Sequence, residues 1–194
     1  MGKRIAIIQG HPDPAPARFG RALAEAYARG AAAAGHEVRV IEVGALDFPL
    51  LRGKQDWERE PPVEAIRQAQ ETIAWAGHLL IIYPLWLGSM PALLKAFLEQ
   101  VMRPGFAIAR PEEGGMGRKL LTGRSARIVV TMGMPALFYR WYFRAHSLKS
   151  LERNILRFCG IAPIRETLIG MVEGAAARRE RWLDRMRELG RAGA

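Results

Sequence analysis

Residues 79–87 read LLIIYPLWL and form the longest apolar run in the chain. The run contains Pro84 and is too short to cross a bilayer, because a membrane-spanning helix needs about 20 apolar residues. We therefore interpret it as a buried strand, His78 to Tyr83, that leads into an apolar loop. A strand that is apolar on both faces is typical of a parallel sheet covered by helices on both sides.

The rest of the chain alternates between apolar strands and helical patterns. Four more strands are predicted, at Arg4 to Gln9, Glu37 to Val43, Arg127 to Met132 and Ile164 to Ile169. Helical spacing of apolar residues marks five helices, at Phe19 to Tyr27, Val63 to Ile73 after Pro61 and Pro62, Pro91 to Met102, Leu148 to Phe158 and Trp182 to Leu189. We expect one α/β domain over residues 1–194, built as a three-layer sandwich. Because parallel crossovers are right-handed, the expected strand order is 2-1-3-4-5.

Two details of these helices can be checked. Pro91 is expected in the first turn of its helix, where proline is favoured. In the fourth helix, the inward stripe is expected to be Leu148, Leu151, Ile155 and Phe158, with Gly160 ending the helix.

Three long loops interrupt the alternation, at residues 44–60, 103–123 and 133–147. Long loops within a compact domain are usually functional or mobile. The first loop carries apolar side chains, among them Leu50 and Trp57, and the helix from Pro91 to Met102 is apolar on more than one side. These surfaces predict a homodimer with its active site at or near the interface.

The net charge and its distribution bear on whether the protein binds nucleic acid or a membrane. The net charge is +10, from 29 basic and 19 acidic residues, but no basic run reaches five. We interpret the charge as a solvated surface; the alternative is attraction to nucleic acid or to an anionic membrane. No base-stacking motif indicates a nucleic-acid partner.

The single cysteine, Cys159, allows no internal disulfide, which suits a reducing compartment. A domain of this size also folds without a metal, and we predict no metal site. Only four apolar residues follow Lys3 and Arg4, so no signal peptide is indicated and a cytoplasmic location is expected.

Ligands of open parallel sheets bind beyond the carboxyl ends of the strands. The loop after the first strand, residues 10–18, enters a helix whose N-terminus suits a phosphate, and His11 and Arg18 stand in it. It matches neither G-x-G-x-x-G nor a P-loop. By itself it favours a proline-stiffened turn with a solvated arginine.

Two further loops follow strands at the same edge. The segment Tyr83 to Pro91 exposes Trp86 to a planar ligand, or else packs beneath a neighbouring loop. The segment that begins Thr131-Met132-Gly133-Met134 has a glycine that lets backbone amides approach a ligand. Further along it, Tyr139 and His146 are candidates to donate to a reducible carbonyl. The alternatives are a packed aromatic for Tyr139 and a cap or surface residue for His146.

Taken together, these segments resemble the flavodoxin-like NAD(P)H:quinone oxidoreductases. That group, the NAD(P)H dehydrogenases (quinone), includes the modulator-of-drug-activity B reductases and the flavin-bearing ancillary subunits of potassium-efflux systems. The resembling stretches are GHPD (10–13) with RFGRAL (18–23), YPLWLG (83–88) with PALLK (91–95), TMG (131–133) and FCG (158–160). They lie in the same order as in the family and are spread over nearly the whole chain. The segment YPLWLG followed by PALLK is the most specific.

The resemblance implies a flavodoxin-like fold and a bound flavin, FAD or FMN. The residues that match cofactor positions are His11, Arg18, Phe19, Gly20 and Ala22 near the phosphate and ribityl end, Pro84, Leu85, Trp86 and Leu87 along the ring, and Thr131, Met132, Gly133 and Met134 at the pyrimidine edge. Tyr139 and His146 resemble the quinone-site tyrosine and histidine of some members, after a one-residue shift.

Two positions depart from the family pattern. Pro16 stands near the place of a hydroxyl residue that many members direct at the phosphate, which leaves that bond to backbone amides and Arg18. Met132 and Met134 stand where members often have Thr-Thr-Gly-Gly after the fourth strand, which changes the polarity of that wall.

The resemblance implies an enzyme that passes hydride from NAD(P)H through the flavin to a quinone or a similar acceptor. The alternatives are a regulatory flavin-binding subunit of a membrane transporter, which would give the chain a peripheral membrane partner, and a small electron carrier. A carrier needs no substrate pocket, so the aromatic loop 133–147 argues against it.

Overall fold

A computed structural model describes residues 2–58, 63–110 and 117–194. Its centre is a five-stranded parallel sheet with the order β2-β1-β3-β4-β5. The strands are β1 (Arg4–Gln9), β2 (Glu37–Glu42), β3 (His78–Pro84), β4 (Ser125–Thr131) and β5 (Ile164–Ile169). Each expected strand is therefore present, with ends that differ by two residues at most, and the expected order is confirmed.

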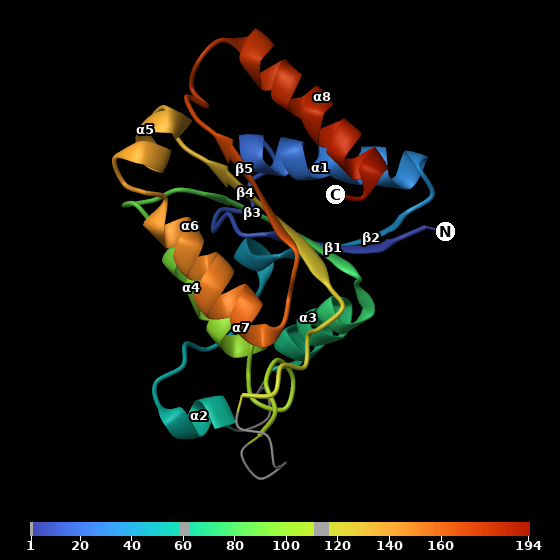
Figure 1. The fold of residues 1–194 in the computed structure, drawn as a ribbon, viewed down its shortest axis with the longest axis vertical. Helices are drawn as coiled ribbons and strands as arrows, with labels where there is room; N and C mark the ends of the chain where they lie inside the picture. The colour runs from blue at the N-terminus through green and yellow to red at the C-terminus, as the bar shows by residue number, and fades with distance from the viewer. Residues whose placement is uncertain (1, 59–62, 111–116) are drawn as a thin grey trace.

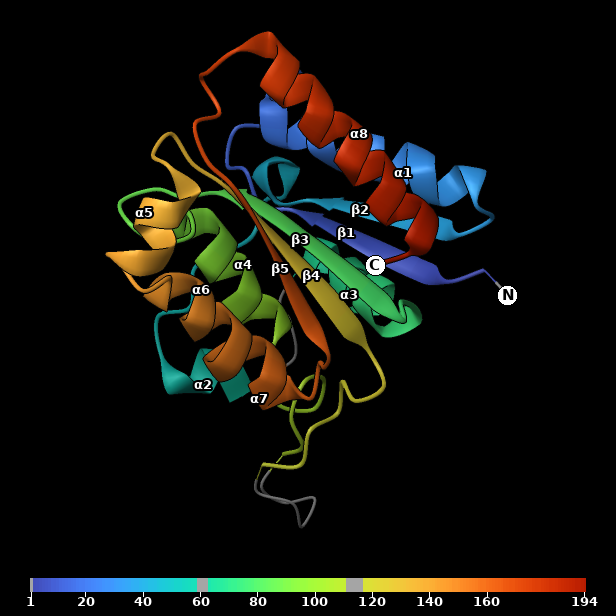
Figure 2. The ribbon, with the colours of Figure 1, turned by 45° about the horizontal axis from the view of Figure 1, so that its top comes forward.

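Helices cover both faces of the sheet, as Figures 1 and 2 show. On one face lie α1 (Phe19–Ala33) and α8 (Ala176–Ala192), and on the other lie α3 (Glu64–Trp75), α4 (Ala92–Val101), α6 (His146–Ser150) and α7 (Arg157–Cys159). Two separate apolar cores result, one on each side of β1, β3 and β4. This is the expected three-layer sandwich. The expected start of α3 at Pro61 and Pro62 lies outside the described residues, and Pro91 precedes α4 as its N-cap rather than lying in its first turn.

The close crossing of α1 and α8 depends on two glycines. A β-carbon on Gly190 would stand 2.1 Å from the Tyr27 carbonyl oxygen, and one on Gly30 would stand 2.1 Å from that of Arg187. No side chain fits at either point, because β-carbon contacts below 3.0 Å essentially do not occur. The two helices thus touch backbone to backbone.

The fourth predicted helix is interrupted by a π-helical turn, Leu151–Leu156 (η3). A π turn inserts one extra residue, so the inward stripe moves on by one position after Leu151. Leu156 and Cys159 are buried in place of the expected Ile155 and Phe158. Phe158 is half exposed, which corrects the expected stripe. Gly160 ends the helix in the left-handed region, as expected.

Two of the predicted loops contain short helices, α2 (Lys54–Glu58) and α5 (Ala136–Trp141). Residues of the first loop also cover α4: Phe48 makes an edge contact with Phe97, and Gln100 Nε2 donates to the Pro49 carbonyl. Leu94, Phe97 and the other inward residues of α4 are buried within one chain. Part of the second apolar side of α4 is therefore covered within one chain, which weakens that part of the argument for a dimer. Among the described residues, none of the helices is long and apolar enough to span a membrane.

Candidate functional site

The carboxyl ends of β1, β3 and β4 meet at one edge, where backbone hydrogen bonds join the segments that follow them. The Gly10 N–H donates to the Ile82 carbonyl (2.8 Å), and the Leu85 N–H donates to the Thr131 carbonyl (2.7 Å). Beyond β4, the Met132 N–H donates to the Ile169 carbonyl (2.9 Å). The three candidate loops are thereby brought to one edge of the sheet, as parallel topology predicts.

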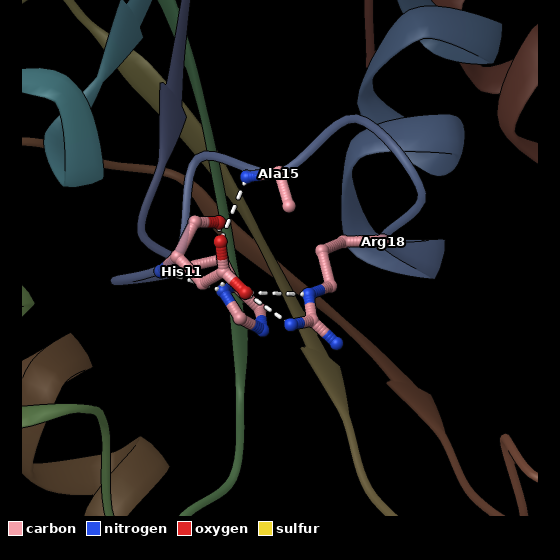
Figure 3. Close-up of polar contacts among 4 residues, drawn as sticks. His11, Ala15 and Arg18 are labelled. Atoms are coloured by element: carbon pink, nitrogen blue, oxygen red, sulfur yellow. Dashed lines mark hydrogen bonds and ion pairs between the residues drawn. The ribbon is translucent and has the colours of Figure 1, made fainter.

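The loop after β1 is closed by its own polar contacts (Figure 3). The Asp13 carboxylate accepts the Ala15 N–H (2.8 Å) and the Arg18 Nε–H (2.9 Å), and a second Arg18 nitrogen also bonds to it. The Ala15 hydrogen bond, and then the Arg18 guanidinium, hold the pKa of Asp13 below its usual value. Arg18, expected to hold a phosphate, thus already has an acidic partner, which sequence reasoning missed.

His11 lies in the same loop. The Asp13 N–H donates to its Nδ1 (3.0 Å), and its ring meets Trp86 edge-on at 5.6 Å. Burial, and then the Arg18 charge, lower the pKa of His11 below 6.5. This shift favours the neutral form of His11.

The N-terminus of α1 has no side-chain cap. The predicted cofactor residues Phe19, Gly20 and Ala22 lie in its first turn or next to it. Arg18 makes no side-chain capping bond, and no acidic residue stands in that turn. The first N–H groups of a helix need partners. They form an anion-binding position when no side chain supplies one.

Gln9 lies at the same position, at the end of β1. Its side chain is 6% exposed, and neither its Nε2 nor its Oε1 atom has a hydrogen-bond partner among the described residues. A buried amide without partners is costly, and a β-carbon on Gly20 would lie 3.9 Å from it. We had not singled out Gln9. The signal was available, because it is the only polar residue after Arg4 in that strand.

The loop after β3 ends in a tight reversal. The Trp86 and Ser89 backbones exchange two hydrogen bonds of 2.9 Å each around Leu87 and Gly88. Both central residues have positive φ, 46° for Leu87 and 76° for Gly88. Leu87 is fully exposed and Trp86 is half exposed, while Pro84 and Leu85 are partly buried. The exposure of Trp86 and Leu87 excludes the interpretation that the tip of this loop packs beneath a neighbouring loop.

The loop after β4 presents backbone to the same edge. Thr131 and Met132 are buried, Gly133 is exposed, and a β-carbon on Gly133 would meet nothing within 4 Å. Neither the Gly133 nor the Met134 N–H has a partner within the part of the chain that the structure describes. The Gly133 and Met134 N–H groups are therefore free to donate at the position that the family resemblance assigns to the pyrimidine edge of a flavin.

Strained backbone gathers at this end of the sheet. The non-glycine residues with positive φ in the described chain are Leu87, Arg144, Ala145 and Met171, and all four follow the carboxyl ends of β3, β4 or β5. Such conformations cost about 1–3 kcal/mol each and cluster at functional sites. The strain thus indicates the same edge as the hydrogen-bond donors do.

Tyr139 is placed differently from our expectation. It is 0% exposed, its hydroxyl lies 2.7 Å from Ser147 Oγ, and it accepts the Leu148 N–H at 3.2 Å. A fully buried phenol with these partners cannot contact an acceptor in this conformation. It holds the start of α6, which His146 begins. His146 itself is exposed, and its Nδ1 donates to the Phe143 carbonyl (2.6 Å), so only Nε2 is available to a ligand.

Tyr139→Phe should lower the free energy of unfolding by about 1–2 kcal/mol, because the buried Leu148 N–H and Ser147 hydroxyl lose their partner. Urea denaturation followed by circular dichroism measures the loss. The matched control is Tyr142→Phe, whose side chain is 72% exposed and should be neutral. A Tyr139→Phe protein as stable as wild type would show that the hydroxyl serves something other than the fold.

The profile of the family described as "Flavodoxin-like fold" matches residues 3–189. The chain belongs to this family. The sequence is 28% identical over 179 residues to an FMN-dependent NADH:quinone oxidoreductase of Nitratidesulfovibrio vulgaris, covering 80% of this chain and 82% of the relative. It is 28% identical over 168 residues to an uncharacterized NAD(P)H oxidoreductase of Haemophilus influenzae, covering 84% of this chain and 82% of the relative.

A solved structure gives the same result. The NAD(P)H:quinone oxidoreductase from Methanothermobacter marburgensis superposes with a TM-score of 0.84 at 26% identity, with all of both chains covered. The resemblance that the loops suggested is therefore confirmed at the level of the flavodoxin-like family.

The residues present fit the flavin that this family resemblance implies. An uncapped helix and an unpartnered buried amide stand where a phosphate and its linker would lie. An exposed indole and two free N–H groups stand along the adjoining loops. The edge therefore has unsatisfied donors and uncovered apolar surface together, as a planar anionic ligand requires.

Proposed function

We propose that this protein is a flavin-dependent NAD(P)H:quinone oxidoreductase that uses FMN. The observation that carries the proposal is the unsatisfied polar position formed by Gln9 and the first turn of α1, beside the exposed Trp86 turn. FMN is favoured over FAD because the Nitratidesulfovibrio relative is named FMN-dependent. When bound, the flavin supplies the redox chemistry by accepting hydride from NAD(P)H and passing it to the acceptor.

Each loop has a separate role in this proposal. The α1 N–H groups and Arg18 bind the phosphate, with His11 and Gln9 as neutral hydrogen-bond partners. Trp86 and Leu87, supported by Pro84 and Leu85, cover the ring and exclude water from it. The Gly133 and Met134 N–H groups stabilise negative charge at the ring edge, where preorganised donors have the largest effect.

His146 and Tyr139 take different parts. His146 Nε2 is the group that would hydrogen-bond the oxygen of the acceptor, because Nδ1 is occupied by Phe143. Tyr139 is a positioning residue that fixes the start of α6. A homodimer remains a prediction, and the surface left for it is the apolar groove lined by Trp57, Leu98, Met102, Ile155 and Phe158.

The test of the proposal is a two-part experiment on the purified chain. Quenching of FMN and FAD fluorescence measures flavin binding, and anaerobic stopped-flow mixing follows reduction by NADH or NADPH and reoxidation by a soluble benzoquinone. We expect FMN to bind and both half-reactions to proceed. A chain that binds neither flavin would overturn the proposal; one whose bound flavin is reduced by neither nucleotide would favour a regulatory subunit or an electron carrier.

Gln9→Leu is the matched variant for that experiment. Removing the unpartnered amide should stabilise the flavin-free protein, because no buried polar group is then left unsatisfied. The same change should weaken FMN binding, because a partner of the ligand is lost. Lower stability together with unchanged FMN affinity would show that Gln9 serves the fold alone.

Arg18→Ala should weaken FMN binding about tenfold, which is the lower end of the roughly 1.5–3 kcal/mol range for a charged hydrogen bond because the side chain is half exposed. Asp13→Asn should have the opposite effect. It keeps Oδ1 for the Ala15 N–H but removes the charge that competes for Arg18 and repels a phosphate. Fluorescence titration measures both. If Asp13→Asn weakens binding as Arg18→Ala does, the ion pair itself is needed to shape the loop.

A further inference from the structure

Exposed large apolar side chains are concentrated at one end of the molecule. Of the ten found among the described residues, five lie on the turn after β3 or on α5, a sixth, Tyr142, directly follows α5, and a seventh, Met171, follows β5. In Figures 1 and 2 the segment after β3 runs beside α5, so the turn and the helix share this end. We call the following six residues the apolar end: Trp86, Leu87, Leu137, Phe138, Trp141 and Tyr142.

Apart from the buried Tyr139, the large apolar side chains of α5 are exposed. Phe138 stacks on Tyr142 at 4.9 Å between ring centroids, and Tyr142 meets Phe143 edge-on at 5.0 Å. Leu137 is 70% exposed and Trp141 is 78% exposed. The packed cluster considered for this loop is present in part: Tyr139 is fully buried, and Phe138, Tyr142 and Phe143 contact one another, yet Phe138 and Tyr142 remain exposed. Exposed apolar side chains gathered at one end of a molecule mark a site of contact with something less polar than water.

The charge around the apolar end is mostly positive. Residues 131–150 contain Arg140, Arg144 and Lys149 and neither Asp nor Glu. Arg140 pairs with Glu166 at 3.3 Å, and both groups are partly exposed. Arg144, like Arg178 and Arg181 on the adjoining groove that Leu137 also lines, has no side-chain partner in the described part of the chain. A partner that binds the apolar end must therefore be apolar in its interior and anionic at its surface.

A second copy of this chain that brought its own α5 against this end does not meet that requirement. A twofold contact through α5 would bring Arg144 and its neighbours close to their own equivalents, and like charges at an interface oppose association. An anionic bilayer does meet it. Tryptophan and tyrosine settle at the level of the lipid headgroups, and arginines near an anionic leaflet are attracted to it.

We propose that the apolar end docks this protein on the surface of anionic membranes. Trp141, Tyr142 and Leu137 enter the headgroup region, and Arg140 and Arg144 contact lipid phosphates. This places the candidate flavin edge, with Trp86 and Leu87, against the bilayer, where quinones with long apolar tails reside. The docking rests on the exposed side chains and their charge and does not require the proposed redox activity.

Vesicle sedimentation of the full chain tests the proposal. Vesicles of phosphatidylcholine alone are compared with vesicles that also contain phosphatidylglycerol, at low and high salt. We expect binding to the anionic vesicles only, and weaker binding as salt rises. Trp141→Ser combined with Leu137→Ser should reduce the partition coefficient at least tenfold, and Arg144→Gln should reduce it about fivefold for the one charge removed.

The control is Leu50→Ser combined with Val40→Ser, which removes two exposed apolar side chains elsewhere on the surface and should change nothing. Absence of binding to anionic vesicles, or equal loss in the control, overturns the proposal. So does a dimer in light scattering that the Trp141 variant dissolves, because the end would then contact a second copy. FMN binding measured on the same samples separates this outcome from failure of the proposed function.

Discussion

Gly190→Ala should lower the free energy of unfolding by about 3 kcal/mol or more, a large effect for one methyl group. The added β-carbon would stand 2.1 Å from the Tyr27 carbonyl oxygen and 3.0 Å from the Ala31 nitrogen. Both are backbone atoms of α1, so no side chain can turn away. The helices must separate, and overpacking of this kind costs about 1–3 kcal/mol and occasionally more.

Helix propensity alone would predict the opposite effect for a glycine-to-alanine substitution. Alanine is favoured over glycine inside a helix by about 0.8–1 kcal/mol, so a solvent-exposed glycine in α8 would be expected to respond with a gain. Gly53→Ala is the control, because its β-carbon would meet nothing within 4 Å. Urea denaturation of both variants decides it. A stable Gly190→Ala protein would mean that α1 and α8 lie further apart than the structure places them.

Lowering the pH from about 6.5 to about 4 should remove roughly 3 kcal/mol of stability through His78 alone. Its side chain is buried at the start of β3, where Nδ1 lies 2.8 Å from Ser125 Oγ and Nε2 has no described partner. Burial, and then the positive charges of Lys3, Arg127 and Arg165, lower the pKa of His78 to about 4. The unfolded chain binds a proton below its ordinary value of 6.5, whereas the folded chain binds it only near 4.

The stability that His78 contributes is therefore complete above pH 6.5 and is lost as the pH falls toward 4. A difference of one pKa unit corresponds to about 1.4 kcal/mol, so the difference between the folded and unfolded pKa values of His78 accounts for the stated loss of unfolding free energy. His78→Leu cannot titrate, so its unfolding free energy should fall less over this interval than that of wild type. Parallel profiles for the two proteins would show that His78 is protonated in the folded state at an ordinary pH.

Strand positions and order could be predicted from this sequence because buried parallel strands are continuous apolar runs, and these runs are bounded by glycines and charged residues. Helix registers were harder to predict. The π turn in η3 inserts one residue without any change in the apolar pattern, so the stripe through Ile155 and Phe158 remained equally consistent with the sequence. Short α2 and α5 lie in segments whose prolines and glycines favour loops.

The candidate site could also be predicted only in part. The edge, its three loops and the positions of His11, Arg18 and Trp86 follow from topology and from the family resemblance. The pairing of Arg18 with Asp13 depends on how the loop closes through Ala15, which no spacing rule specifies. Tyr139 and His146 were taken together as neighbours of an acceptor, yet the phenol of Tyr139 on α5 is buried and the imidazole of His146 at the start of α6 is exposed. The direction of a side chain in an irregular segment depends on tertiary packing.

The contact between α1 and α8 also bears on how the protein is made. α8 is translated long after α1, and the core on that face of the sheet combines Leu23 and Tyr27 with Met186 and Leu189. During synthesis the side of α1 that α8 covers therefore stays open until residues 176–192 have left the ribosome. A ribosome that stalls before residue 176 therefore releases a product in which the smaller of the two cores lacks Met186 and Leu189.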